Sequence, residues 1–264
     1  MTPLPPRAII GVVHLRPLPG APRFDAVTGM AAVLEAAAAD ARAYAQGGAH
    51  ALVVENFGDV PFTRGSVAPE TVAAMALASA AVREAAPGLP LGFNVLRNDA
   101  RAALGLCAAA GGDFIRVNVH CGAAVADQGI LEGDAYATLR CRAALCPGAA
   151  IFADIHVKHA EPLGGGSIKQ AAREAVERGL ADGLIVSGSG TGQKTDPNDL
   201  ARVRAACPES KIFVGSGSDA ESAPALLEFA DGLIVGTAAK RGGILANPVE
   251  VSRVAAIVRA AAKA

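Results

Sequence analysis

The chain lacks a surplus of charge of either sign. Its 24 Lys and Arg residues nearly balance 25 Asp and Glu residues, which leaves a formal net charge of −1. A balanced chain has no sequence-wide field that would recruit nucleic acid or an anionic membrane. We therefore expect no nucleic-acid partner, and any anionic ligand must be bound by a local group of residues.

The sequence also lacks an uninterrupted apolar run of membrane length, although alanine is abundant. Alanine-rich stretches such as 36–39 and 102–110 have helix-forming and charged neighbours instead. We expect no membrane span. The first residues show neither the basic nor the apolar region of a secretory signal, which favours the cytoplasm.

The sequence contains few cysteines, and their spacing follows no paired motif. The five cysteines, at positions 107, 121, 141, 146 and 207, are an odd number, and no C-x-x-C pair occurs among them. Neither a disulfide framework nor a structural zinc site follows from this pattern.

The sequence does contain short β-branched runs, and they alternate with alanine-rich segments of helical composition. The eight predicted strands are 8–15, 51–56, 91–96, 114–120, 150–157, 183–186, 211–214 and 232–235. Strict alternation predicts parallel strands joined by right-handed crossovers. The segment after the first strand, 11–20, contains prolines that do not fit a nucleotide-binding turn, which argues against an open doubly wound sheet. We predict an α/β fold in which residues 1–264 form a single (β/α)₈ TIM-barrel domain.

The hexapeptide ADGLIV occurs twice, at 181–186 and 230–235, and each copy runs into glycine and hydroxyl residues. The strand 211–214 ends in the same way. Small residues after three successive strands let backbone N–H groups approach an anion closely, whereas one such glycine alone can simply form a short turn. The predicted phosphate-binding residues are Ser187, Gly188, Gly190, Gly215, Ser216, Gly217, Gly236 and Thr237.

Two middle strands alternate polar and apolar side chains, which is unusual for parallel strands covered on both faces. Their polar faces consist of Arg116, Asn118 and His120 on the fourth strand and of Asp154, His156 and Lys158 on the fifth. If the apolar faces pack against helices, these groups point into the barrel. Because a buried charge is costly unless paired, they form either an interior ion pair, such as Arg116 with Asp154, or a ligand site.

Other strands also end in polar residues, and barrel enzymes place their chemistry at these carboxyl ends. The predicted catalytic residues are Glu55, Asn94, Arg116, Asn118, Asp154, His156 and Lys158. Lys158 could form a Schiff base or stabilise an oxyanion, and Asp154 or Glu55 could move a proton. His156 could act as acid, base or metal ligand.

The sequence assigns no metal ligand and no cofactor. His14, Glu55, Asp154 and His156 carry donors that a divalent metal accepts, but no H-x-x-x-H motif marks a site, so a divalent ion stays an open alternative. The segments 57–65 and 158–167 are either lids over the barrel mouth or ordinary connectors.

Six strings in order along the chain together resemble the BtpA/SgcQ family. They are GVVHLRPLPG (11–20), VENFGDVPF (54–62), GFNVLRN (92–98), FIRVN (114–118), ADIHVKH (153–159) and SGSGTG (187–192). The resemblance covers essentially the whole chain and implies a barrel of the ribulose-phosphate-binding type. It also implies two contexts: photosynthetic members are associated with photosystem I biogenesis, and SgcQ-like members resemble sugar-pathway proteins labelled as nucleotide hydrolases.

These observations favour an enzyme that acts on a small phosphorylated metabolite, such as a phosphosugar, by proton transfer, isomerisation or cleavage of a C–C or C–O bond. The alternative is a noncatalytic photosystem I assembly factor, for which peripheral membrane association would be expected. A nucleotide phosphatase ranks lower, because the chain has no G-x-x-x-x-G-K-[ST] loop. We further expect a homo-oligomer.

Overall fold

Eight parallel strands close into a barrel in the computed structural model, which describes residues 4–188, 190 and 194–264. Their order around the barrel is β1-β11-β10-β9-β7-β4-β3-β2. The strands are β1 (Ala8–His14), β2 (Ala51–Glu55), β3 (Leu91–Asn94), β4 (Phe114–Val117), β7 (Ala150–Ile155), β9 (Gly183–Val186), β10 (Lys211–Val214) and β11 (Gly232–Val235). All eight predicted strands are confirmed, although several end earlier than expected, and the fold is the predicted α/β barrel.

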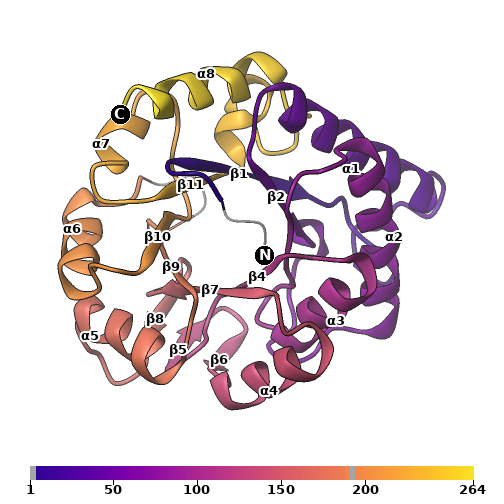
Figure 1. Cartoon of the computed structure of the whole chain (residues 1–264). Coiled ribbons are helices and arrows are strands. Elements are labelled where there is room, and N and C mark those ends of the chain that lie inside the picture. The colour runs from indigo at the N-terminus through magenta and orange to yellow at the C-terminus, as the bar shows by residue number, and fades with distance from the viewer. Residues whose placement is uncertain (1–3, 189, 191–193) are drawn as a thin grey trace.

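Helices surround the barrel as an outer ring (Figure 1). They are α1 (Gly29–Gln46), α2 (Pro69–Ala85), α3 (Ala100–Ala110), α4 (Ala135–Leu145), α5 (Ile168–Arg173), α6 (Pro197–Ala206), α7 (Ala223–Leu226) and α8 (Val251–Ala262). A π-helical turn, Glu174–Arg178, continues α5. Among the helices of the described residues, none is long and apolar enough to span a membrane.

Cap residues explain where several helices begin. Asp99, Asp134, Ser167 and Asp196 each accept a hydrogen bond from a backbone N–H of the first turn through their side chains. Such caps satisfy donors that the helix itself leaves free. Helix α7 has only four residues, and the Asp219 side chain accepts hydrogen bonds from the N–H groups of Glu221 and Ser222 in a turn just before it.

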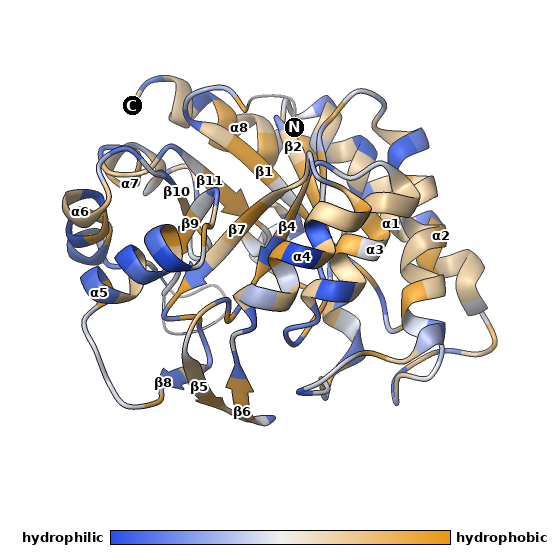
Figure 2. Ribbon diagram, turned by 60° about the horizontal axis from the view of Figure 1, so that its bottom comes forward, coloured by the Kyte–Doolittle hydropathy of each residue, from blue (hydrophilic) through white to orange (hydrophobic). Residues whose placement is uncertain are grey.

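A second sheet of three antiparallel strands, in the order β6-β5-β8, was not predicted. It consists of β5 (Ala123–Ala126), β6 (Gly129–Glu132) and β8 (Ala160–Pro162). Because β5 and β6 follow barrel strand β4 and β8 follows β7, this sheet lies at the carboxyl end of the barrel, and Figure 2 shows it projecting from that end. Part of the expected lid segment 158–167 is thus a strand.

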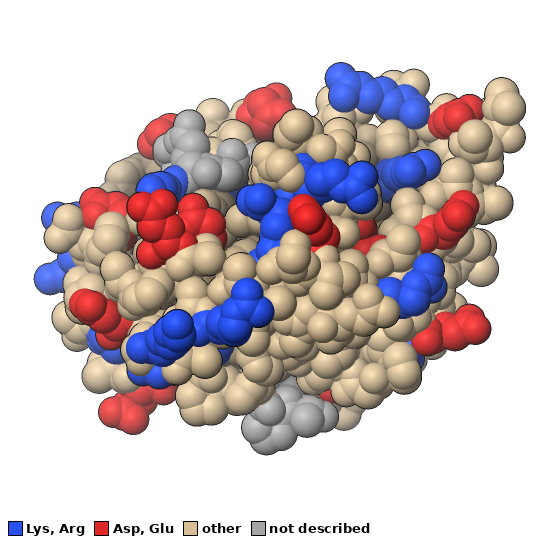
Figure 3. Space-filling view, turned by 90° about the horizontal axis from the view of Figure 1, so that it is seen from above, with Lys and Arg blue, Asp and Glu red and all other residues tan. Residues whose placement is uncertain are grey.

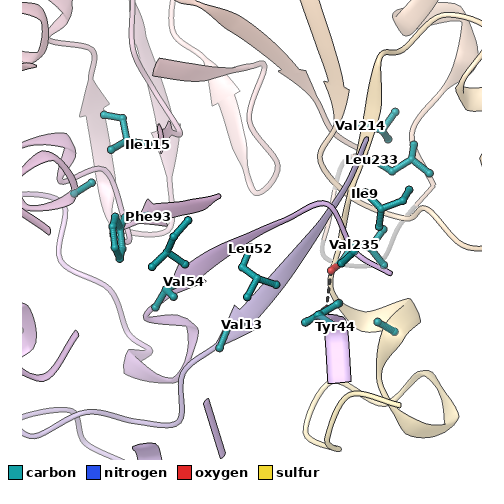
Figure 4. Close-up of a cluster of buried hydrophobic side chains, with 14 of the residues drawn as sticks. Ile9, Val13, Tyr44, Leu52, Val54, Phe93, Ile115, Val214, Leu233 and Val235 are labelled. Atoms are coloured by element: carbon teal, nitrogen blue, oxygen red, sulfur yellow. Dashed lines mark hydrogen bonds between the residues drawn. The ribbon is translucent and has the colours of Figure 1, made fainter. Parts of the chain in front are cut away.

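Apolar side chains fill both the barrel and the layer beneath the helices. Inside the barrel, the Phe152 ring packs between Phe114 and Phe213 at centroid distances of 5.0 and 4.8 Å. Outside it, buried residues of strands and helices form one large cluster, in which the fully buried Tyr44 hydroxyl donates to Val235 O at 2.8 Å (Figure 4). The lower barrel is therefore a packed core.

The surface carries charge of both signs. On the face that contains α8, basic and acidic side chains are interspersed (Figure 3). This pattern agrees with the formal net charge of −1.

Candidate active site in the barrel mouth

Arg116 and Asp154 form a buried ion pair between neighbouring strands β4 and β7. The guanidinium donates from Nε and Nη2 to the two carboxylate oxygens, both at 2.8 Å, and the side chains are 3% and 0% exposed. Asn118 Nδ2 and Ser187 Oγ donate to the same carboxylate at 2.9 and 3.3 Å. Burial alone would lower the pKa of Arg116, but the Asp154 carboxylate raises it above its ordinary value. Asp154 therefore orients three donors at once.

Asn94 extends this network towards β3. Its Nδ2 donates to Arg116 O and to Asn118 Oδ1, each at 3.2 Å. Its own Oδ1 is buried without a hydrogen-bond partner in the described part of the chain. A buried acceptor of this kind commonly binds an ordered water molecule.

A cavity of about 250 Å³ opens at the carboxyl ends of the strands and brings predicted catalytic and phosphate-binding residues together. Its lining consists of Val12, His14, Glu55, Arg116, Lys158, Lys194, Gly215, Ser216, Gly217, Ser218, Asp219, Ile234, Gly236, Thr237, Ala238, Gly243 and Arg253. We call it the mouth cavity. It has an acid–base side, from the ends of β1, β2, β4 and β7, and a glycine-rich side, from the turns after β10 and β11.

His14 and Glu55 are aligned on the acid–base side, because they are register partners on β1 and β2. His14 Nε2 lies 3.8 Å from Glu55 Oε1, and the Phe57 ring packs edge-on against the imidazole with centroids 5.0 Å apart. Burial lowers the pKa of His14 well below its ordinary value, and the cations Lys240, Lys158 and Arg116 lower it further. The ring is therefore neutral near pH 7 and can accept a proton.

Lys158 reaches the same cavity from the segment that follows β7. Burial lowers its pKa, and the cation Arg116 adds to the effect while the Glu55 carboxylate opposes it. The buried Arg97 side chain holds this segment in place, because its Nη2 donates to Lys158 O at 2.6 Å. A lysine with a lowered pKa has more of the nucleophilic amine near neutral pH.

On the glycine-rich side, two glycines lie too close to neighbouring side chains to carry a Cβ. A Cβ at Gly215 would meet the Ser187 hydroxyl, and one at Gly236 would lie 2.6 Å from His14 Cε1. Gly217 has a φ of 69°, which disfavours most other residues. Thr237 begins a 3₁₀ turn, so its N–H has no acceptor within that turn.

Three further residues of this side were not predicted. Ser218 is 3% exposed, and its Oγ has no hydrogen-bond partner in the described part of the chain. Arg253 extends from α8 and donates from Nε to Ala238 O at 2.8 Å. Lys194, from the segment before α6, also lines the mouth cavity. Within the described residues, neither cation has a carboxylate within 4.0 Å. Both are placed to neutralise an anion.

Several predicted residues lie outside the mouth cavity. His156 adopts a left-handed φ of 54° just after β7 and lines two neighbouring pockets instead. Burial lowers its pKa. His120 also leaves the predicted polar face, because β4 ends at Val117; its Nε2 lies 2.8 Å from Gly179 O. The expectation that each strand continues its alternation to these histidines was wrong.

The loop after β9 is also set apart from the mouth cavity. Ser187 and Gly188 line a neighbouring pocket, and Gly188 N donates to Ser216 Oγ at 3.2 Å. Gly190 is buried and lines none of these cavities. The rest of the expected wall, Ser189 and residues 191–192, lies outside the described residues.

Metal-binding side chains do not gather in the region that the structure describes, where no group of three or more His, Cys, Asp or Glu residues is placed to hold an ion. His14 and Glu55 approach each other, but Asp154 is engaged by Arg116 and His156 faces other pockets. The mouth cavity thus combines imidazole, carboxylate, ammonium and guanidinium groups with glycine-rich turns.

Comparison with known sequences identifies close relatives over almost the full length. A family model described as "BtpA family" matches residues 6–263. The photosystem I biogenesis protein BtpA of Synechocystis sp. is 42% identical over 97% of this chain and 88% of its own length. Uncharacterized proteins of Thermococcus kodakarensis and Caenorhabditis elegans are 43% and 33% identical, covering 97% and 95% of this chain and 95% and 91% of theirs.

Solved structures agree on the fold. A structure named "Native KDPGal structure" matches with a TM-score of 0.58 at 15% identity and covers 97% of this chain and 96% of its own. Phosphoribosyl anthranilate isomerase from Thermus thermophilus matches with a TM-score of 0.58 at 16% identity, covering 97% and 98%. At such identities the likeness concerns the barrel fold alone.

Proposed function

The chain belongs to the BtpA family, and we propose that it is an enzyme acting on a small phosphorylated metabolite, with a phosphosugar as the simplest candidate. The reaction is a proton transfer that leads to isomerisation or to cleavage of a C–C or C–O bond. The phosphate occupies the glycine-rich side of the mouth cavity, and the reacting carbons face the acid–base side.

This proposal depends on one observation: a single cavity of about 250 Å³ contains both glycine-rich turns with nearby cations and acid–base side chains. On one side, the turns at Gly217 and Thr237 and the cations Lys194 and Arg253 suit a phosphate, and the turns after β10 and β11 are where barrel proteins commonly bind one. On the other side, Glu55 and a neutral His14 can take or give a proton, and Lys158 can stabilise an oxyanion.

Two buried polar atoms without partners strengthen the case for a ligand. Within the described residues, Ser218 Oγ and His14 Nδ1 have no hydrogen-bond partner, and both residues line the mouth cavity. Leaving a buried polar atom unpaired costs about 1–3 kcal/mol, so such atoms usually serve a ligand or an ordered water.

A second candidate function, assembly of photosystem I, rests on the name of the Synechocystis relative. The polar lining of an open cavity favours the enzyme, because an assembly factor needs an exposed apolar patch and has no use for buried Glu55 and His14. The relative from an animal, Caenorhabditis elegans, also favours a function other than photosystem assembly. One domain over residues 1–264, a cytoplasmic location and a homo-oligomer remain our predictions.

Thermal unfolding with added phosphate compounds tests the proposal. Inorganic phosphate and small phosphate esters should raise the Tm of the wild type, because a ligand at 100 times its Kd stabilises the folded state by about 2.7 kcal/mol. Gly217→Asp should abolish this shift by placing a carboxylate in the phosphate site.

Gly217→Asn is the matched control. Asn tolerates the left-handed φ as Asp does and adds no charge, so the phosphate-induced shift should be weakened less than in Gly217→Asp. Absence of any shift in the wild type, or an equal shift in wild type and Gly217→Asp, would contradict the proposed phosphate site.

A further inference from the structure

Lys158 differs from every other lysine that the chain contains. The six lysines are Lys158, Lys169, Lys194, Lys211, Lys240 and Lys263. Four of them, at 169, 194, 211 and 263, are exposed, and Lys240 is buried in an ion pair with Asp40. Lys158 is half-buried, and within the described residues no carboxylate lies within 4.0 Å of its ammonium. A desolvated lysine without a partner is costly unless it has a chemical use.

The main chain at Lys158 is also held in place. The buried Arg97 ties the main chain of Lys158 by the 2.6 Å hydrogen bond to its carbonyl. Glu55 lines the same cavity without forming an ion pair with Lys158, so the two groups lie more than 4.0 Å apart. A substrate group can therefore lie between an amine and a carboxylate, with His14 beside the carboxylate at 3.8 Å.

We propose that Lys158 forms a covalent imine with the carbonyl carbon of a small phosphorylated aldehyde or ketone bound in the mouth cavity. This inference rests on the proposed function, because a phosphate bound on the glycine-rich side of the mouth cavity places the carbonyl group near Lys158. Burial and the cation Arg116 lower the pKa of Lys158, which supplies the neutral amine that imine formation needs.

Imine formation needs no reactant besides the carbonyl compound and the side chains of the mouth cavity. One proton leaves the ammonium for Glu55 or His14, and the lone pair of Nζ then forms the C–N bond as the carbonyl π electrons move to oxygen. The oxygen takes up that proton and a second one from Nζ and leaves as water, so the ammonium and the carbonyl become a protonated imine and one water. The imine withdraws electrons from the adjacent carbon, from which Glu55 or His14 then removes a proton.

Reductive trapping tests the proposal on the full-length protein. Glycolaldehyde phosphate is added with sodium borohydride at pH 7, and the reduced adduct is mapped by peptide mass spectrometry. We expect more adduct on Lys158 than on any exposed lysine, since the lowered pKa of Lys158 raises its fraction of neutral amine at pH 7. Lys158→Met should remove this adduct, and Lys169→Met, which changes an exposed lysine of α5, should leave it.

Two further measurements test the imine and the phosphate site independently of each other. Inorganic phosphate and Gly217→Asp should both reduce labelling by glycolaldehyde phosphate, and Gly217→Asp should reduce labelling by unphosphorylated glycolaldehyde less. Phosphate-induced stabilisation without selective adduct on Lys158 would overturn the imine and leave the phosphate site intact. Absence of both would overturn the imine and the proposed function together. Mapping in the wild type does not depend on whether Lys158→Met folds.

Discussion

Replacing Asp154 by Asn removes the charge that holds Arg116 while keeping the size of the side chain. The pair has two hydrogen bonds of 2.8 Å and side chains that are at most 3% exposed, so the variant leaves a buried guanidinium without its counter-charge. Breaking a buried pair in this way costs about 3–5 kcal/mol. At about 2–4 °C per kcal/mol for a domain near this size, the Tm should fall by about 6–20 °C.

Differential scanning calorimetry in buffers with and without phosphate measures this effect. Arg202→Gln is the control, because its pair with Asp199 is exposed and is worth only about 0.3–0.5 kcal/mol. Since Arg116 lines the mouth cavity, phosphate should raise the Tm of Asp154→Asn more than that of the wild type. A loss below about 1 kcal/mol would refute the view that this pair is a fully desolvated anchor of the site.

Two other predictions concern the barrel and its acid sensitivity. Gly92→Ala should lower the free energy of unfolding by about 1–3 kcal/mol, since its Cβ would collide with the Phe114 ring. Gly105→Ala in α3 has open space and should raise the free energy of unfolding by about 0.5–1 kcal/mol. Urea unfolding in which both variants change stability in the same direction would contradict this. The lowered pKa of His14 means that the unfolded chain binds a proton that the folded chain excludes, so wild-type stability should fall as the pH drops below about 6.5. In His14→Gln the slope of the unfolding free energy between about pH 5 and 6.5 should be smaller by up to about 1.4 kcal/mol per pH unit, and unchanged slopes would show that His14 is not desolvated.

The barrel and the polar interior could be predicted because period-two alternation holds for as long as a chain stays in the sheet. Arg116 and Asp154 lie within β4 and β7 and point inwards as expected. The alternation no longer holds once the strand ends. Left-handed φ at His156 turns the chain, so that Lys158 reaches the mouth cavity and His156 does not.

The small sheet escaped prediction for a different reason. Strand β5 is mostly alanine, which favours helices and gives little hydrophobic contrast between the two faces. Its partner β6 starts at Gly129, whose φ of 100° marks the tight turn between them. The two-residue connection followed by glycine is the signal that could have identified this hairpin.

The cations on the glycine-rich side of the mouth cavity could not be found from sequence spacing. Arg253 belongs to α8, far along the chain from the turn after β10, and only the closure of the barrel brings the two together. Lys194 precedes α6 in a segment without any periodic pattern. Glycine-rich strand ends mark where an anion would bind, but the charged side chains that neutralise it depend on the tertiary fold.

A crystal structure of the wild type grown with inorganic phosphate would show whether the mouth cavity binds phosphate. We predict phosphate in the mouth cavity, within hydrogen-bond distance of the backbone at Gly217 and Thr237 and of the Ser218 hydroxyl, with Arg253 or Lys194 beside it. Phosphate bound elsewhere, with this cavity holding only water at phosphate concentrations that raise the Tm, would contradict it.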